Sequence, residues 1–142
     1  MIRCAAPQDL TQILELYTHL HNNPVPNELP VALWQEIMAD PNHYVVIAEQ
    51  TGRLVSSCVL LVVPNLTRGQ RPYALVENVV THADYRKQDL ASAVLNFAKE
   101  IATQRNCYKI MLMTGTKEAA TLRFYERAGY NSTDKTGFIQ WL

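Results

Sequence analysis

The chain has 142 residues, of which 48% are hydrophobic, and its thirteen Lys and Arg residues balance thirteen Asp and Glu residues. This length suits one domain that buries about two thirds of its unfolded surface. Because the net charge is zero, no overall positive field draws the protein to nucleic acid or to an anionic membrane, and any anion site must be local. We therefore expect a single domain over residues 1–142 that binds neither nucleic acid nor membrane.

The cysteines argue against cross-linking and zinc. Cys4, Cys58 and Cys107 are odd in number and form no C-x-x-C pair, and each lies in an apolar, strand-like run, which predicts buried free thiols. Residues 1–10 lack the apolar core of a signal peptide, and the longest apolar run, residues 58–63, is too short to cross a bilayer. A cytoplasmic protein without a bound metal is the expectation.

The first half of the chain predicts a strand, two helices and a hairpin. A short strand over residues 1–5 comes first, and apolar side chains then recur at helical spacing over residues 7–20, with Pro7 in the first turn. Three prolines mark residues 21–30 as a loop, and Pro30 can start a second helix that Pro41 ends. Two β-rich runs, 43–49 and 53–63, are separated by Gln-Thr-Gly, which predicts a hairpin.

The second half alternates strands and helices. Residues 73–81 predict a strand, residues 90–102 a helix, residues 106–114 a strand, and residues 117–128 a helix that Gly129 closes. The run GFIQWL, residues 137–142, predicts a last strand. The order β-α-α-β-β-β-α-β-α-β has no repeat and no linker, so it predicts one α/β domain.

The strongest functional pattern is the strand, loop and helix over residues 75–102. A helix N-terminus offers unpaired backbone N–H groups and a positive dipole end, where a phosphate is stabilised. Ala91, Ser92 and Ala93 permit close approach to the first turn, and Arg86 and Lys87 add positive charge. An ordinary βα connection remains the alternative. Neither G-x-x-x-x-G-K-[ST] nor G-x-G-x-x-G occurs, which argues against a nucleotide triphosphatase and a dinucleotide-binding fold.

Two segments resemble a known family. ENVVTHADYRKQDLASAVL, residues 77–95, resembles the central motif of the GNAT superfamily of acetyl-CoA-dependent N-acetyltransferases, [QR]-x-x-G-x-[GA], which spans Arg86 to Ala91 here. AATLRFYERAGY, residues 119–130, resembles the later A-x-x-F-Y-x-x-x-G-[FY] segment, and MIRCAAPQDLTQILELY resembles the first strand and helix of the family. The resemblance implies a mixed central sheet of about six strands flanked by about four helices.

The resemblance also implies acetyl-CoA as the acyl donor. In the family, backbone amides of the loop hold the pyrophosphate, and the pantetheine arm pairs with the preceding strand as an added strand. The coenzyme-binding residues implied are Val79, Val80 and Thr81 on the strand, and Arg86, Lys87, Gln88, Asp89, Leu90, Ala91 and Ser92 in the loop and the first helical turn.

The implied reaction is direct attack of a primary amine on the thioester within a ternary complex. Glu77 matches a frequent general base of the family, Tyr125 matches its general acid, and the backbone N–H of Val79 is a candidate oxyanion donor. Each has an alternative, because Glu77 can face solvent and Tyr125 can be a core aromatic residue. His82 is either a substitute base or, as we expect, a solvated loop histidine. The acceptor cannot be read from the sequence, and a homodimer would fit exposed edge strands.

Asp89 departs from the family pattern, because it stands where the motif has glycine. Aspartate tolerates unusual backbone angles, but its carboxylate can repel a pyrophosphate or cap its own helix. An alternative function is therefore a non-catalytic acyl-CoA-binding or regulatory domain of the same fold, weakened by Asp89. An interaction domain that binds no coenzyme is a third.

Overall fold

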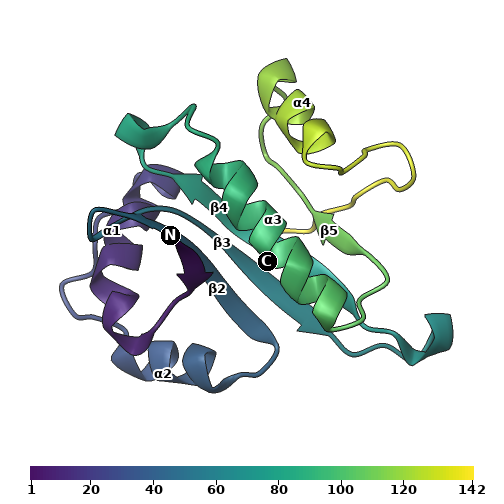
Figure 1. Ribbon diagram of the computed structural model, residues 1–142, viewed down its shortest axis with the longest axis horizontal. Helices are drawn as coiled ribbons and strands as arrows, with labels where there is room; N and C mark the ends of the chain where they lie inside the picture. Colours follow the sequence, from purple (N-terminus) through teal and green to yellow (C-terminus); the bar gives the residue numbers. More distant parts are fainter.

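The computed structural model describes residues 1–142 as one mixed sheet with helices on both faces (Figure 1). The strands lie in the order β1-β2-β3-β4-β5, and every neighbouring pair is antiparallel except β4 and β5, which are parallel. The strands are β1 (Ile2–Cys4), β2 (His43–Gln50), β3 (Arg53–Val63), β4 (Tyr73–Thr81) and β5 (Ile110–Leu112). The α-helices are α1 (Leu10–His21), α2 (Val31–Ala39), α3 (Leu90–Gln104) and α4 (Ala119–Arg127), and short 3₁₀ turns cover Pro7–Asp9, Arg68–Gln70 and Ala83–Tyr85.

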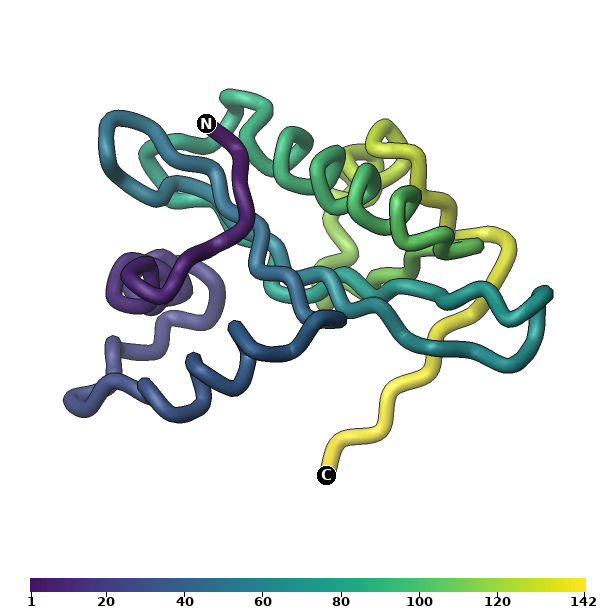
Figure 2. The backbone as a smooth tube through the Cα atoms, turned by 60° about the horizontal axis from the view of Figure 1, so that its bottom comes forward, coloured from purple at the N-terminus to yellow at the C-terminus, as the bar shows by residue number.

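Each face of the sheet has its own core, as Figure 2 shows with α1 and α2 on one side and α3 and α4 on the other. Side chains alternate along a strand, so in β2 Val45 and Ile47 pack toward α1 and α2, whereas Val46 and Ala48 pack toward α3. Because both faces are covered, β2 and β3 contain uninterrupted apolar runs, residues 44–48 and 58–63. Their continuous apolar runs therefore reflect burial on two sides.

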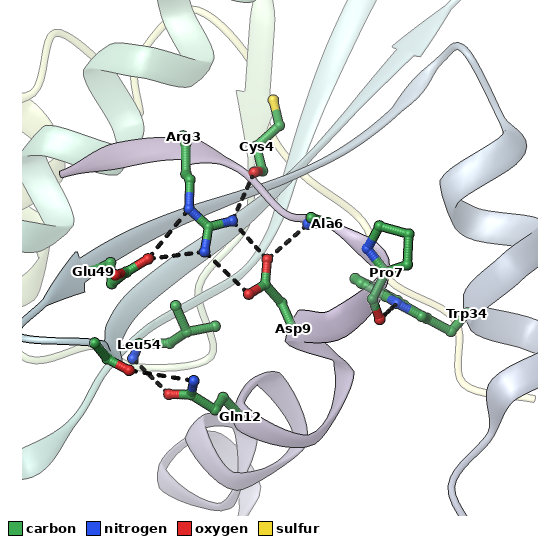
Figure 3. Close-up of polar contacts among 10 residues, drawn as sticks. Arg3, Cys4, Ala6, Pro7, Asp9, Gln12, Trp34, Glu49 and Leu54 are labelled. Atoms are coloured by element: carbon green, nitrogen blue, oxygen red, sulfur yellow. Dashed lines mark hydrogen bonds and ion pairs between the residues drawn. The ribbon is translucent and has the colours of Figure 1, made fainter.

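An ion network fixes the start of α1 to the sheet (Figure 3). The Arg3 guanidinium donates to both carboxylate oxygens of Asp9, at 2.6 and 3.1 Å, and to the Glu49 carboxylate at 2.9 Å. Asp9 also accepts from the backbone N–H of Ala6 at 2.7 Å and is 4% exposed. The hydrogen bonds from Arg3 hold the pKa of the Asp9 carboxyl below its usual range. This network joins β1, β2 and the first turn before α1.

The structure confirms the mixed α/β sheet and the four helices, but it has five strands. The predicted last strand is wrong, because residues 137–142 form no strand and Phe138, Trp141 and Leu142 are exposed. Strand formation depends on a partner edge, and the neighbouring β5 is three residues long. The segment passes β5 at Gly137, where an added Cβ would lie 3.4 Å from the Met113 sulfur, and then runs away from the body (Figure 2).

The cysteine prediction is right for one residue. Cys58 is fully buried, Cys107 is partly buried and Cys4 is exposed, and all three are free thiols. Residues 2–4 form a short strand at the sheet edge in which no residue is fully buried, so an apolar neighbourhood in sequence does not guarantee burial there. No helix is long and apolar enough to span a membrane.

Candidate active site

A β-bulge interrupts β4 beside the predicted base. Glu77 pairs with Val59 and Val80 pairs with Ser57, so Asn78 and Val79 together face the single residue Cys58. Asn78 has φ +50°, the left-handed region that asparagine tolerates. A bulge of this kind bends the strand and redirects its side chains. The sequence reasoning missed Asn78, whose only signal was an asparagine within an otherwise β-rich run.

Beyond the bulge, one edge of β4 has no strand beside it. The parallel pairing with β5 covers Ala74–Val76 only, so residues 77–81 pair with β3 alone. The Ser56 hydroxyl donates to the Val80 carbonyl at 2.9 Å and lies 2.8 Å from the Thr81 hydroxyl. These contacts tie Val80 and Thr81 to β3 and leave the opposite edge of the backbone free. This free β4 edge includes Val79, Val80 and Thr81, the residues along which the family resemblance implies the pantetheine arm.

The loop after β4 presents a run of unpaired backbone donors. The N–H groups of residues 87–92 donate no hydrogen bond to any group of the chain. Lys87 and Asp89 both have positive φ, +62° and +57°, which turns the backbone sharply before α3. Arg86 reaches back, and its Nε donates to the Thr81 carbonyl at 3.5 Å. Six free amides at the positive end of a fifteen-residue helix form a site for an anion.

Asp89 occupies the N-cap position of α3 without capping it. Its side chain makes no hydrogen bond to the first turn, so the alternative in which Asp89 occupies the phosphate-binding amides is wrong. The cause is its left-handed backbone, because an N-cap residue needs extended angles to aim its side chain at the next amides. The position requires the backbone freedom for which glycine is suited. Of the other loop residues, Gln88 is exposed, Ala91 and Ser92 are half-buried, and Leu90 packs into the core.

Glu77 faces a cavity. Its pairing with Val59, a core residue on the side of α1 and α2, sets its side chain on that face of the sheet. There it lines an open cavity of about 440 Å³ bordered by α1, α2 and strands β2 to β4. Glu77 is exposed, so its carboxylate faces solvent, as one of the two sequence-based alternatives expected. The solvent lies inside the cavity and not on the open outer surface.

Tyr125 lies on the other side of the sheet. With Phe124 it packs against the core under α3, and its ring lies 6.2 Å from that of Tyr130. Burial, followed by the nearby Cys58 thiol, raises the pKa of the Tyr125 hydroxyl. Glu77 and Tyr125 therefore do not touch. Tyr125 packs against the core cluster that contains Cys58, the residue opposite the bulge, whereas Glu77 lies on the other face of the sheet.

His82 is not the solvated histidine that the sequence suggested. It is 8% exposed, its Nε2 lies 2.9 Å from the Arg53 guanidinium, and its ring packs 4.1 Å from that of His19. Burial, with the charges of His19 and Arg53, lowers the pKa of His82. The residue anchors the end of β4. The Cys58 thiol is held inert, because burial raises its pKa to about 12.

The sequence and the fold both match known acetyltransferases. Residues 10–130 match the Acetyltransferase (GNAT) family. The chain belongs to the GNAT acetyltransferase family. It is 31% identical over 136 residues to a glucosamine 6-phosphate N-acetyltransferase of Trypanosoma brucei brucei, covering 94% of this chain and 90% of that protein.

Solved structures of similar proteins share the whole fold. A candidate acetyltransferase of Agrobacterium tumefaciens superposes with a TM-score of 0.94 and is 39% identical, over 100% of this chain and 99% of the other. A protein of Bacillus halodurans described as a transcriptional regulator superposes with a TM-score of 0.87 and is 27% identical, over 99% of both chains. GNAT acetyltransferases use acetyl-CoA as the donor. No cluster of three or more potential metal-ligating side chains occurs in this one.

Proposed function

We propose that the protein is an acetyl-CoA-dependent N-acetyltransferase that moves the acetyl group to a primary amine by direct attack in a ternary complex. One arrangement carries this proposal: the free amides of residues 87–92 adjoin the free β4 edge, and Glu77 stands on β4 beside a cavity. A single strand and its following loop thus combine a phosphate site, an edge for an extended chain and a carboxylate.

Coenzyme A fits the groups that this arrangement offers. Its pyrophosphate would accept hydrogen bonds from the amides of residues 87–92, with Arg86 and Lys87 supplying positive charge. Its pantetheine arm has two amide groups, and these would bond to the backbone of Val79, Val80 and Thr81 as an added strand does. Acetyl-CoA supplies the activated acetyl group as a thioester.

Glu77 and Tyr125 would divide the two proton transfers. An amine is protonated at neutral pH and must lose a proton before it attacks, and Glu77 faces the cavity from which it would enter. The departing sulfur needs a proton, and burial keeps Tyr125 in its protonated form. Glu77 and Tyr125 lie on opposite faces of the sheet, and in this proposal the amine and the coenzyme would meet between them, at Asn78 and Val79.

A non-catalytic acyl-CoA-binding or regulatory domain is the second candidate. Asp89 favours it, because a carboxylate beside the amide cradle opposes a pyrophosphate. A relative described as a transcriptional regulator is compatible with it. In that case the protein binds acetyl-CoA without transferring the acetyl group, and replacing Glu77 leaves the Kd for acetyl-CoA unchanged.

Self-association belongs to the same proposal. The apolar side chains of Phe138, Ile139 and Trp141 are exposed on a segment that leaves the body, and a second copy of the chain would cover them in a homodimer.

Calorimetry with acetyl-CoA, followed by an assay of thiol release with amines, tests the function. Micromolar binding, about −8 kcal/mol, together with amine-dependent thiol release supports the enzyme. Binding without thiol release from any amine favours the regulatory domain. An absence of binding up to millimolar acetyl-CoA rejects both and points to an interaction domain.

A further inference from the structure

The cavity in front of Glu77 is apolar, and its lining limits the chemical class of amine that it can bind. It lies between α1, α2 and the sheet, and ten of its fourteen lining residues are hydrophobic. We propose that the acceptor is a primary amine carried on an aliphatic or aromatic body, without a phosphate group. This inference rests on the proposed function, because it assumes that the acceptor amine binds in this cavity before acetyl transfer.

The walls of the cavity offer contact without hydrogen bonds. They are formed by side chains of α1, α2 and β3, among them Leu14, Leu33, Trp34, Ile37, Val59 and Leu61. The Trp34 indole N–H donates to the Pro7 carbonyl at 3.0 Å, so this tryptophan presents only ring surface to the cavity. Sugar hydroxyls placed against such walls would lose water without gaining partners, whereas a hydrocarbon body is stabilised there.

The few polar groups of the cavity suit an ammonium ion. Glu77 and Asn78 lie where β4 borders the cavity, Tyr17 and His43 contribute the remaining polar atoms, and no Lys or Arg lines it. Burial raises the pKa of the Tyr17 hydroxyl, which keeps it neutral, against a smaller opposite effect of the Ser57 and Asn78 side chains. His43 is the one lining side chain that can carry positive charge.

This distribution of charge opposes a phosphorylated acceptor. A phosphate in the cavity would face the Glu77 carboxylate and could find only His43 as a cation. Proteins that select phosphates present arginine or lysine side chains, or backbone amides at a helix N-terminus. In this chain the free amides lie in the loop at residues 87–92, which the coenzyme would occupy. The preferred acceptor should therefore differ from glucosamine 6-phosphate, the substrate in the name of the trypanosomal relative.

Two pairs of amines test the inference by thiol release at saturating acetyl-CoA. Leucinamide and glycinamide share the reacting amine and differ only in an isobutyl group. Burial of that group in the cavity should raise kcat/KM for leucinamide at least about tenfold over glycinamide. Glucosamine 6-phosphate should be a poorer acceptor than glucosamine. Equal rates for the two amides, or a preference for the phosphorylated sugar, would overturn the inference and leave an acetyltransferase in place.

A cavity variant with a matched control locates the effect. Leu33 is 55% exposed at the cavity, so Leu33→Arg introduces a cation there without disturbing the core. It should reduce the advantage of leucinamide severalfold and leave the acetyl-CoA affinity unchanged. Leu66→Arg makes the same change at a leucine that is 88% exposed and lies outside the cavity, and it should behave as the wild type. An undiminished advantage of leucinamide in Leu33→Arg would exclude this cavity as the acceptor site.

A binding measurement separates failure of the inference from failure of the proposed function. If no amine is acetylated, catalysis is rejected, and ligand-observed NMR with leucinamide and glycinamide still reports on the cavity. Stronger binding of leucinamide that Leu33→Arg weakens and Leu66→Arg retains would support the apolar site. Equal signals for both amides in all three proteins would reject it.

Discussion

Replacing Asp89 with glycine should tighten acetyl-CoA binding tenfold to a hundredfold. At ~6 Å from a pyrophosphate charge, with an effective dielectric of about 20, a carboxylate contributes a repulsion near 3 kcal/mol per charge pair. Asp89 is exposed, so solvent and salt roughly halve the repulsion from each charge, and one to two pyrophosphate charges then give about 1.4 to 2.8 kcal/mol, a tenfold to hundredfold change in Kd. The side chain makes no capping hydrogen bond, so its removal frees no competing interaction.

Asp89→Asn separates charge from backbone. Asparagine keeps the size of the side chain and tolerates the left-handed angles of this position, but it carries no charge. The strain of a left-handed residue is present with and without ligand, so it changes stability and not affinity. Asparagine should therefore reproduce most of the gain of glycine. Glycine relieves strain but enlarges the unfolded ensemble, so the melting temperatures of the three proteins should be similar.

The assay is calorimetric titration of acetyl-CoA into each protein at NaCl concentrations from about 20 mM to about 500 mM, over which the Debye length falls severalfold. The advantage of both variants should shrink as salt rises. If neither variant binds more tightly, the carboxylate does not oppose the coenzyme, and the reasoning is refuted. If glycine alone improves binding, close backbone approach is the cause and the electrostatic account is wrong.

Four further changes probe catalysis, stability and assembly. Glu77→Gln should lower kcat about 100-fold or more at an unchanged Kd for acetyl-CoA, and an unchanged kcat would exclude the carboxylate as base. Tyr125→Phe should lower kcat to a similar extent and remove the alkaline limb of the pH–rate profile. In the wild type this limb should lie above the ordinary pKa of a tyrosine hydroxyl, because the pKa of Tyr125 is raised. An alkaline limb that persists in Tyr125→Phe would show that another group causes it. Asp9→Asn should cost about 3 kcal/mol in urea unfolding at neutral pH. Because the pKa of Asp9 is lower in the folded state, the wild-type advantage should be complete above about pH 4 and disappear as the pH falls through the folded pKa; an advantage that persists below it would contradict this account. Deleting residues 137–142 should convert the proposed homodimer into a monomer in sedimentation, and an unchanged mass would exclude this segment as the contact.

Periodicity in the sequence was enough to predict the helices and most strands. In α1 and α3 the apolar side chains recur on one face, and in β2 and β3 the continuous apolar runs require two covered faces. The strand predicted at residues 137–142 was wrong because its apolar pattern is local, whereas a strand also needs a neighbouring edge of sufficient length. That requirement depends on β5, whose three residues could not be foreseen from the longer β-rich run around them.

The strand and loop of the candidate site could be predicted from the sequence, but the cavity beside them could not. The unpaired amides of the loop could be predicted because they precede a helix, and the start of that helix is visible in the local apolar pattern from Leu90 onward. The cavity before Glu77 arises where α1 and α2 meet three strands, so it depends on packing between residues far apart in sequence. The bulge at Asn78 depends on a register that no short pattern records. The buried His82 shows the same limit, because Arg53 and His19 reach it from other elements.

The free β4 edge affects the solubility and the degradation of the protein when no ligand is bound. Five consecutive residues, 77–81, present a strand edge without a partner, and such edges recruit other extended chains and lead to aggregation. A ligand that pairs with this edge covers it and adds RT ln(1 + [L]/Kd) to the free energy of unfolding. If coenzyme A is that ligand, its supply also sets how long the protein lasts: acyl-CoA starvation would make it less soluble and more readily degraded, and coenzyme added during purification would preserve it.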